Sequence, residues 1–278
     1  MSQALALLLT KLLFLGYKSG RFLSGLFVCC LSSCVSAHSI SVFMGAEHWL
    51  YQEFNTSGAE LNREQGWLPG AEVAALWQLT GSTWLSVQWM QQQGALDYIG
   101  ATQAGTTHIT RTDETTRKYR ISWRFIAESF YIGAGIQQFD WDREIRAENG
   151  VLQLHEYYHW LGPVLETGFI YQSSDWGIDV NSYAGWWLQG DMRIDLQHVG
   201  YGNPVVPLHE GYEAGINLQF NYRLSERWAV SLKHQQGWRY FPASGYVSAY
   251  KGFSRIELHE PESRNHFQGY WLGVQYHF

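Results

Sequence analysis

Cysteine and long hydrophobic runs are both scarce in this sequence of 278 residues. All three cysteines lie within residues 1–37, so no disulfide is expected in residues 38–278. Beyond residue 37, no uninterrupted apolar run approaches the roughly 20 residues that a membrane-spanning helix needs. A surplus of basic residues is also absent, because the net charge is −6. This balance argues against binding to nucleic acid, which requires a basic footprint.

Residues 1–37 resemble a secretory signal peptide that is removed from the mature chain. A positively charged region precedes an apolar stretch over residues 22–35, and Val35-Ser36-Ala37 offers small residues for cleavage before His38. Two alternatives stay open. The segment ending at Cys34 also resembles a lipoprotein box in which Cys34 would be lipidated, and the apolar residues before Lys18 leave the true start codon undecided.

Aromatic side chains and a period of two dominate the remaining sequence. The chain holds 14 Trp, 17 Tyr and 14 Phe, an aromatic content that suits the interfacial girdles of a membrane protein. Apolar residues recur at every second position, and from Tyr212 to Arg223 they alternate strictly with polar residues or glycine. Because a strand turns successive side chains to opposite faces, this pattern predicts an all-β fold.

The last nine residues carry a pattern of their own. Apolar or aromatic side chains occupy every second position up to the final residue, namely Tyr270, Leu272, Val274, Tyr276 and Phe278. This ending resembles the closing strand of Gram-negative outer-membrane β-barrels, in which the terminal strand is also the signal for membrane insertion. The resemblance implies a location in the outer membrane. It also implies contacts with outer-membrane lipid and lipopolysaccharide, and recognition by the barrel-assembly machinery.

Short and long connections alternate along the chain, as in outer-membrane barrels that keep short turns in the periplasm and long loops outside. The long polar connections are 52–66, 99–116, 143–153, 197–210 and 241–265. We therefore predict one transmembrane antiparallel up-and-down β-barrel over residues 38–278, with both ends in the periplasm. Its ten expected strands are 39–51, 67–79, 84–98, 117–126, 130–142, 154–171, 176–196, 211–223, 228–240 and 266–278.

Two strands show irregularities. In the strand from Phe130, the alternation changes phase near Gln137-Gln138, which predicts a bulge that turns Phe139 and Trp141 toward lipid. Pro163 in the sixth strand removes a ladder hydrogen bond and predicts a second bulge or a local break.

With the apolar faces turned outward, the lumen collects charged residues of both signs. A barrel of about ten strands is only slightly wider than one that side chains can fill, and unpaired charges there would be costly. We therefore expect a paired polar network that largely closes the lumen, with a narrow channel for small solutes as the alternative. The expected members are Glu47, Glu72, Arg120, Arg124, Asp179, Asp191, Arg193, Glu213, Arg223, Lys233 and Arg239.

The candidate catalytic residues lie where strands meet long loops. Ten-stranded outer-membrane barrels include the omptin proteases, and the size and loop layout of this chain resemble theirs. Omptins place an acidic pair and an Asp–His pair across a rim cleft, where they activate water. The counterparts here are Asp140 and Asp142, expected on the inward face, with Asp195 and His198. Asp195 and His198 are three residues apart instead of two, and no omptin motif surrounds them, so the resemblance is one of architecture.

No metal or cofactor is expected. His155 and His159 are four residues apart, a spacing that would place two zinc ligands on one face of a helix. In a strand, the same spacing separates them by about 13 Å, too far to bind one metal ion. The other histidines are scattered, and none pairs with a serine as a lipid hydrolase would require.

The long connections carry the remaining functional signals. Residues 53–70 and 98–116 suit ordinary polar loops, or a surface for a glycan, lipopolysaccharide or a host ligand. The fifth connection carries Tyr246, Tyr250, Phe253 and Ile256, which indicates a loop folded into the barrel mouth or a contact surface. The sequence thus favours a non-enzymatic protein that binds or gives structure through its outer loops, over a narrow channel or a rim hydrolase.

Overall fold

The computed structural model describes residues 38–101, 106–148 and 150–278. The signal-peptide and lipidation hypotheses therefore lie outside the described residues. Apart from one short 3-10 helix, η2 (Gln197–Val199), the regular elements formed by these residues are all strands. They are β1 (Ser39–Phe54), β2 (Glu60–Gln78), β3 (Thr83–Ala101), β4 (Thr107–Ala127), β5 (Phe130–Ile145), β6 (Leu154–Gln172), β7 (Trp176–Trp187), β8 (Gln189–Asp195), β9 (Val205–Leu208), β10 (Gly211–Arg223), β11 (Trp228–Phe241), β12 (Val247–Lys251), β13 (Ser254–Leu258) and β14 (Glu262–His277).

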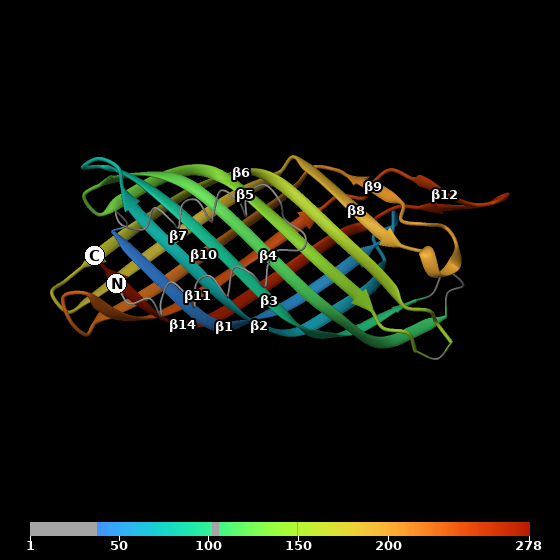
Figure 1. Ribbon diagram of the computed structural model, residues 1–278, viewed down its shortest axis with the longest axis horizontal. Coiled ribbons are helices and arrows are strands. Elements are labelled where there is room, and N and C mark those ends of the chain that lie inside the picture. The colour runs from blue at the N-terminus through green and yellow to red at the C-terminus, as the bar shows by residue number, and fades with distance from the viewer. Residues whose placement is uncertain (1–37, 102–105, 149) are drawn as a thin grey trace.

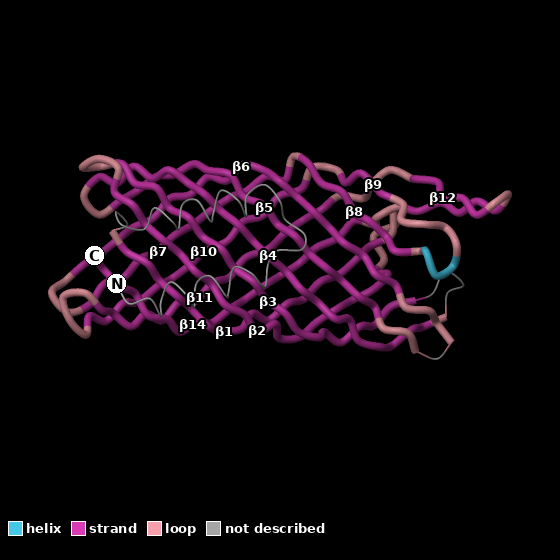
Figure 2. The backbone as a smooth tube through the Cα atoms, in the orientation of Figure 1, coloured by secondary structure: helices cyan, strands magenta, loops and turns pink. Residues whose placement is uncertain are grey.

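The strands close into an antiparallel barrel whose wall has ten strands, as the alternation predicts. Successive wall strands pair with each other, and β1 pairs with β14 to close the ring. β7 and β8 together form one wall strand, because both pair with β6. β9 adds to the edge of β8, and β12 and β13 form a separate hairpin. Figures 1 and 2 show the long, tilted strands of this barrel.

The two ends of the barrel differ. At one end, which we call the turn end, short connections join the strands and the C terminus lies beside the first described residue, since the Phe278 amide donates to the His38 carbonyl at 3.2 Å. The other end, which we call the loop end, carries η2, β9 and the β12–β13 hairpin (Figure 1). Among the described residues, no helix is long and apolar enough to cross a membrane.

The first two predicted long loops are mostly strand. β1 and β2 are joined through residues 55–59, and β4 already begins at Thr107. The prediction was wrong for a physical reason. At the loop end, the outward residues of these strands are polar, as on Arg111 and Asp113, so the apolar stripe that marks a strand is missing even though the ladder continues.

The predicted bulge in the fifth strand is also wrong. β5 pairs with β4 and β6 in one register throughout Gln137 and Gln138. Phe139 and Trp141 are buried and face the lumen. The phase of the sequence pattern changes because the lumen itself becomes aromatic toward the loop end, while the outward residues there become polar.

The irregularity expected at Pro163 lies in the opposite strand. β6 stays continuous, with Pro163 paired to Ile136 of β5. On the other side, the register with the seventh wall strand changes by one residue at Leu188, between β7 and β8. A one-residue shift turns the following side chains to the other face.

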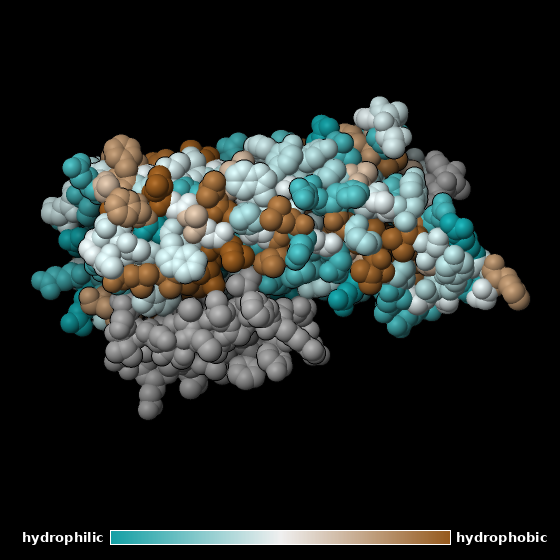
Figure 3. Space-filling model, turned by 90° about the horizontal axis from the view of Figure 1, so that it is seen from above, coloured by the Kyte–Doolittle hydropathy of each residue, from teal (hydrophilic) through white to brown (hydrophobic). Residues whose placement is uncertain are grey.

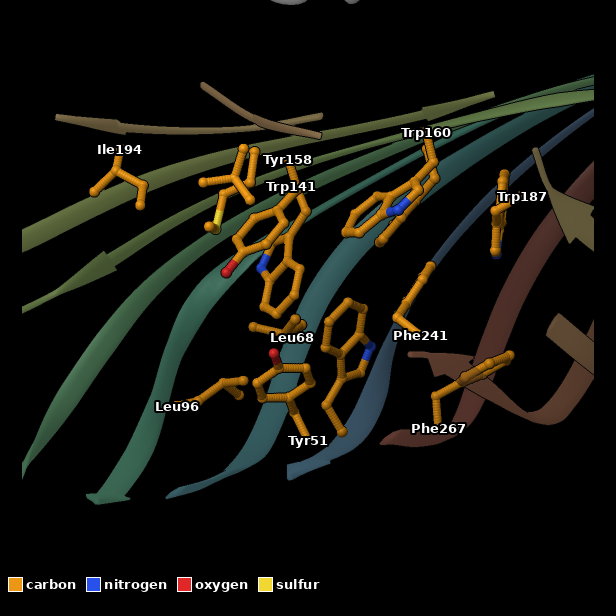
Figure 4. Packing of buried hydrophobic residues seen from close by; sticks show 14 residues of the cluster. Tyr51, Leu68, Leu96, Trp141, Tyr158, Trp160, Trp187, Ile194, Phe241 and Phe267 are labelled. Carbon is orange, nitrogen blue, oxygen red and sulfur yellow. The ribbon is translucent and has the colours of Figure 1, made fainter. Parts of the chain in front are cut away.

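The apolar face of the wall points outward and the lumen holds the largest buried side chains. Exposed apolar residues on the outside include Ile132, Leu165, Ile216, Leu218, Leu232 and Leu272. Figure 3 shows hydrophobic residues along the barrel body and hydrophilic ones toward the loop end. Inside, aromatic rings pack face to face, with Trp160 4.4 Å from Phe241 and 5.3 Å from Tyr158 between ring centroids (Figure 4). We call this set the aromatic cluster; it comprises Trp49, Tyr51, Leu68, Leu96, Phe139, Trp141, Tyr158, Trp160, Trp187, Met192, Ile194, Val206, Phe241 and Phe267.

Truncating a ring of the aromatic cluster should destabilise the barrel. Phe139→Ala removes a ring that is 1% exposed and should lower the free energy of unfolding by about 3–5 kcal/mol. The matched control is Phe220→Ala on the outer face, where the ring is 42% exposed, and its cost should be less than half as large. Urea unfolding of the refolded barrel, followed by heat-modifiable mobility, measures both. Equal losses would contradict the inward placement of Phe139.

Candidate functional site

Toward the turn end, the lumen is crossed by ion pairs. Glu213 is buried among three cations: Lys118 contacts it, Arg239 Nε lies 2.8 Å from its carboxylate, and Arg120 Nη2 lies at 3.8 Å. Glu166 accepts two hydrogen bonds from Arg124, at 2.7 and 3.0 Å. Since each buried charge faces an opposite charge, this layer stays inside the barrel without the full cost of desolvation.

Further polar pairs extend this layer. Lys233 contacts Glu72, and Glu47 accepts hydrogen bonds from Trp49 and Gln235. Asp179 accepts a hydrogen bond from the Tyr131 hydroxyl at 3.3 Å. Of the expected lumen residues, eight therefore lie inside the barrel and take part in polar contacts: Glu47, Glu72, Arg120, Arg124, Asp179, Glu213, Lys233 and Arg239.

Three expected lumen residues lie elsewhere. Asp191 and Arg193 alternate with the buried Met192 and Ile194 and therefore point out of the barrel. The one-residue register change at Leu188 reverses the phase on which the prediction rested. Arg223 keeps the inward register, opposite Ala229 of β11, but it is exposed at the end of the lumen on the turn side.

Small cavities remain between these polar side chains. One of about 110 Å³ is lined by residues that include Glu72, Arg124, Asp179 and Lys233, and it lies toward the turn end. A second, of about 50 Å³, lies between Lys118, Arg239 and Phe267. Phe267 belongs to the aromatic cluster, which fills the lumen beyond it.

The outer apolar belt ends well before the loop end. On β6, the outward residues from Tyr171 to Leu161 are mainly apolar, and the next outward residues are His159, Tyr157 and His155. A strand that rises about 3.3 Å per residue at a tilt of about 40° covers roughly 25 Å over that stretch, the height of a bilayer-facing band. We call the part of the wall beyond Leu161 the upper barrel.

Inside the upper barrel, one arginine holds several glutamates. Arg143 donates to Glu53 at 3.0 Å, to Glu156 at 2.8 Å and to Glu64 at 2.8 Å. Glu114 lies opposite Arg143 in the ladder and accepts a hydrogen bond from Trp141. Burial raises the pKa of Glu114 well above its ordinary value, and the neighbouring charge of Glu64 raises it further.

The sequence prediction missed this group because it assigned Glu53, Glu64, Glu114 and Arg143 to loops. The sequence nevertheless contains a strand pattern in this segment. His108, Thr110, Thr112, Glu114 and Thr116 alternate strictly, and all five are buried inside the barrel. Both faces of this strand segment are mainly polar, so a search for alternating hydrophobic residues could not identify it as a strand.

Glu260 closes the mouth over the Arg143 group. It lies in the connection from β13 to β14 and is buried, and its carboxyl accepts hydrogen bonds from the hydroxyls of Tyr51 and Tyr158, each at 3.2 Å. Its backbone is tied to Ser244 across the same connection, by hydrogen bonds of 2.7 and 2.8 Å. Val247 and Leu258 at the base of the β12–β13 hairpin pack on the aromatic cluster. Part of the fifth connection therefore folds into the mouth.

The rest of that connection projects outward as the β12–β13 hairpin (Figure 1). Tyr250 is 61% exposed and Phe253 is fully exposed at the tip. Gly252, with φ of 57°, is the first of two turn residues, which suits a tight hairpin turn. Tyr201, after η2, contacts Ser254 through a hydroxyl–hydroxyl hydrogen bond of 2.8 Å, so the hairpin is braced by the neighbouring loop.

The candidate catalytic aspartates lie on the outside of the upper barrel, and their expected inward placement is wrong. Asp140 alternates with the lumen residues Phe139 and Trp141, and its carboxylate lies 2.7 Å from His159 Nδ1. Asp142 lies 2.7 Å from His155 Nε2, a hydrogen bond that raises the pKa of His155. These two Asp–His pairs were not predicted from the sequence, because the alternation indicated a change of phase in the strand that contains both aspartates.

The other two candidates do not join an omptin-like cleft. Asp195 points outward opposite His155 and accepts a hydrogen bond from the Gln197 amide at 3.0 Å. His198 is exposed in η2. Within residues 38–101, 106–148 and 150–278, no three His, Cys, Asp or Glu side chains are placed to hold a metal ion.

Neutralising Glu213 should destabilise the barrel strongly. Glu213→Gln leaves Lys118, Arg120 and Arg239 without their shared anion in a buried layer, and should cost about 3–5 kcal/mol of unfolding free energy. The control is Glu257→Gln, which breaks the exposed Arg255–Glu257 pair and should cost less than about 1 kcal/mol. Urea titration of both variants is the measurement, and a Glu213→Gln barrel as stable as the control would refute the ion-pair layer.

Comparison with known proteins supports the fold. No protein-family profile matches the sequence, and no curated protein is similar to it. The outer-membrane protease OmpT from Escherichia coli superposes with a TM-score of 0.59 at 10% identity, over 88% of this chain and 99% of OmpT. The β domain of the Bordetella autotransporter BrkA has a TM-score of 0.43 at 13% identity, over 86% of this chain and 100% of that domain. The translocator domain of NalP from Neisseria meningitidis has a TM-score of 0.43 at 9% identity, over 92% of this chain and 95% of that domain. The closed antiparallel barrel and its superposition on OmpT show that the chain has the fold of an outer-membrane β-barrel.

Proposed function

We propose that the protein resides in the outer membrane as a closed barrel and acts through its loop end as a binding protein. The apolar belt would contact outer-membrane lipid and lipopolysaccharide, with the turn end in the periplasm. The outward residues Tyr270, Leu272 and Val274 of β14 and the terminal Phe278 fit the proposed insertion signal, since all four are exposed. The barrel-assembly machinery would read this strand.

The filled lumen is the main observation that supports the proposal of a closed, non-conducting barrel. Trp49, Trp160 and Trp187 are each no more than 2% exposed, and they pack within the aromatic cluster across the upper lumen. The ion pairs around Glu213 occupy the space below it. A dry aromatic layer gives an ion no partners to replace its hydration shell, so it opposes conduction.

A narrow channel is the alternative that conductance can test. The refolded protein should produce no stepwise conductance in planar lipid bilayers, under conditions in which a general porin does. A channel would instead show discrete steps whose ion selectivity changes in Arg120→Gln, where a lumen charge is lost, and stays unchanged in Asp191→Asn on the outer wall. Such steps would refute the closed state.

The β12–β13 hairpin is the surface best placed for binding. Its exposed rings, on Tyr246, Tyr250 and Phe253, are unusual so far from the apolar belt, and Lys251 and Arg255 are exposed beside them. Aromatic faces pack on the apolar faces of sugar rings, and cationic side chains pair with acidic groups. The hairpin therefore suits an anionic glycan.

Removing the hairpin rings should weaken binding to such a glycan. Heparin serves as the sulfated probe and dextran as its neutral counterpart, with binding followed by calorimetry on the refolded protein. The double variant Tyr250→Ser, Phe253→Ser should bind heparin at least about tenfold more weakly, a loss of about 1.4 kcal/mol. The control Leu152→Ser changes an exposed apolar residue in another loop and should bind as the wild type does. Equal affinity in the double variant, or no wild-type affinity for heparin, would sink the proposal.

A rim hydrolase has weaker support. The Asp140–His159 pair could orient an imidazole toward lipid head groups. Among the described residues, however, neither His155 nor His159 forms a hydrogen bond with a serine or threonine hydroxyl that could act as nucleophile. The geometry therefore favours binding over hydrolysis.

A further inference from the structure

The closed mouth has fewer hydroxyl hydrogens than contacts between tyrosine hydroxyls and carboxyl groups within hydrogen-bonding distance. The Tyr51 hydroxyl lies 3.0 Å from Glu53 and 3.2 Å from Glu260. The Tyr158 hydroxyl lies 3.0 Å from Glu156 and 3.2 Å from Glu260. Each hydroxyl carries one hydrogen, and an ionised carboxylate carries none. If all three carboxyl groups were ionised, two of these four contacts would bring oxygens together with no hydrogen between them.

Of the three carboxyl groups that the two tyrosine hydroxyls contact, Glu260 is the one that forms no ion pair with a cation. Arg143 donates to Glu53, Glu64 and Glu156. Within the part of the chain that the structure describes, no lysine, arginine or histidine forms an ion pair with Glu260. A buried carboxylate without a cation is strongly disfavoured relative to its neutral form. A neutral Glu260 also supplies a further hydrogen to the tyrosine contacts.

We propose that Glu260 is a proton-operated latch: as a neutral acid it holds residues 242–261 over the barrel mouth, and on losing its proton it leaves the mouth and releases that segment. The latch goes beyond the proposed binding role, because it would control the segment that carries the β12–β13 hairpin. The titratable and charged groups that face it are Tyr51 and Glu53 on β1, Arg143 on β5, and Glu156 and Tyr158 on β6, with Glu64 on β2, Tyr98 on β3 and Glu114 on β4 behind them.

The direction of the pH dependence follows from the environment of the carboxyl group. Burial raises the pKa of Glu260 well above 4.5, the charges of Glu53 and Glu156 raise it further, and Arg143 opposes them. In the open form, the carboxyl group is in water and keeps its ordinary pKa. The closed form therefore binds the proton more tightly, and closure is fully favoured below about pH 4.5. As the pH rises from there toward the raised pKa, the closing equilibrium falls about tenfold per pH unit for one proton.

Hydrogen exchange of the full-length protein in micelles tests the latch without a ligand or a conductance. Protection of residues 243–261 is followed by mass spectrometry between about pH 5 and pH 9, after correction for intrinsic exchange. In the wild type, protection should fall with rising pH by up to about tenfold per unit. Glu260→Gln keeps a neutral side chain of the same shape, so its protection should stay high and independent of pH. The control Glu257→Gln lies on the exposed hairpin and should follow the wild type.

A second variant covers the case in which Glu260→Gln does not assemble. Glu260→Ala removes the side chain that bridges Tyr51 and Tyr158, so protection of the segment should be low at every pH. A wild-type profile that is flat across the range would overturn the latch, as would a Glu260→Gln or Glu260→Ala profile that still falls with pH as the wild type does.

Discussion

The whole structure depends on a sheet that closes on itself with ten strands in its wall. Along the apolar belt, closure pairs both edges of every wall strand, which is what allows a polar backbone to stand in an apolar surround. It also fixes a lumen only slightly wider than side chains can fill. The side chain of each wall residue then points either to the apolar belt outside or to the crowded lumen inside. The lumen cannot hold unpaired charges, and the pairs around Glu213 and the glutamates around Arg143 both follow from that constraint.

The lumen meets this constraint in layers. Cations outnumber anions around Glu213, whereas anions outnumber cations around Arg143. The aromatic cluster separates the two. This separation fits the raised pKa of Glu114, since packed rings lie between it and the surplus cations below. The chemistry at the mouth is therefore controlled locally, by Arg143 and by the segment that carries Glu260.

Sequence patterns predicted the wall well and the upper barrel poorly. The strands and most lumen charges, such as Glu213 and Arg239, follow from an apolar stripe that faces outward. The prediction from an outward apolar stripe fails in the upper barrel, where the outer face is polar. Phe139 and Trp141 were predicted to face lipid because the usual pattern has an apolar outer face and a polar lumen. In the upper barrel the lumen is aromatic and the outer face is polar, so the pattern is reversed. Asp191 was misplaced by a one-residue register change that no composition signal marks. The Arg143 group lay in segments that are polar on both faces, and the contact of Glu260 with Tyr51 and Tyr158 joins residues more than a hundred positions apart.

The central claim is that one set of tryptophans fills the lumen while another lies on the outer face of the barrel, which the proposed membrane location would expose to lipid. Nuclear Overhauser effects between indole N–H protons and detergent acyl chains test it most directly in the refolded, isotope-labelled barrel. Trp49, Trp141, Trp160 and Trp187 should show contacts to neighbouring rings and none to detergent, whereas the exposed Trp123, Trp228 and Trp238 should show detergent contacts. A detergent contact from Trp141 or Trp160 would contradict the account, because it would turn β5 or β6 inside out.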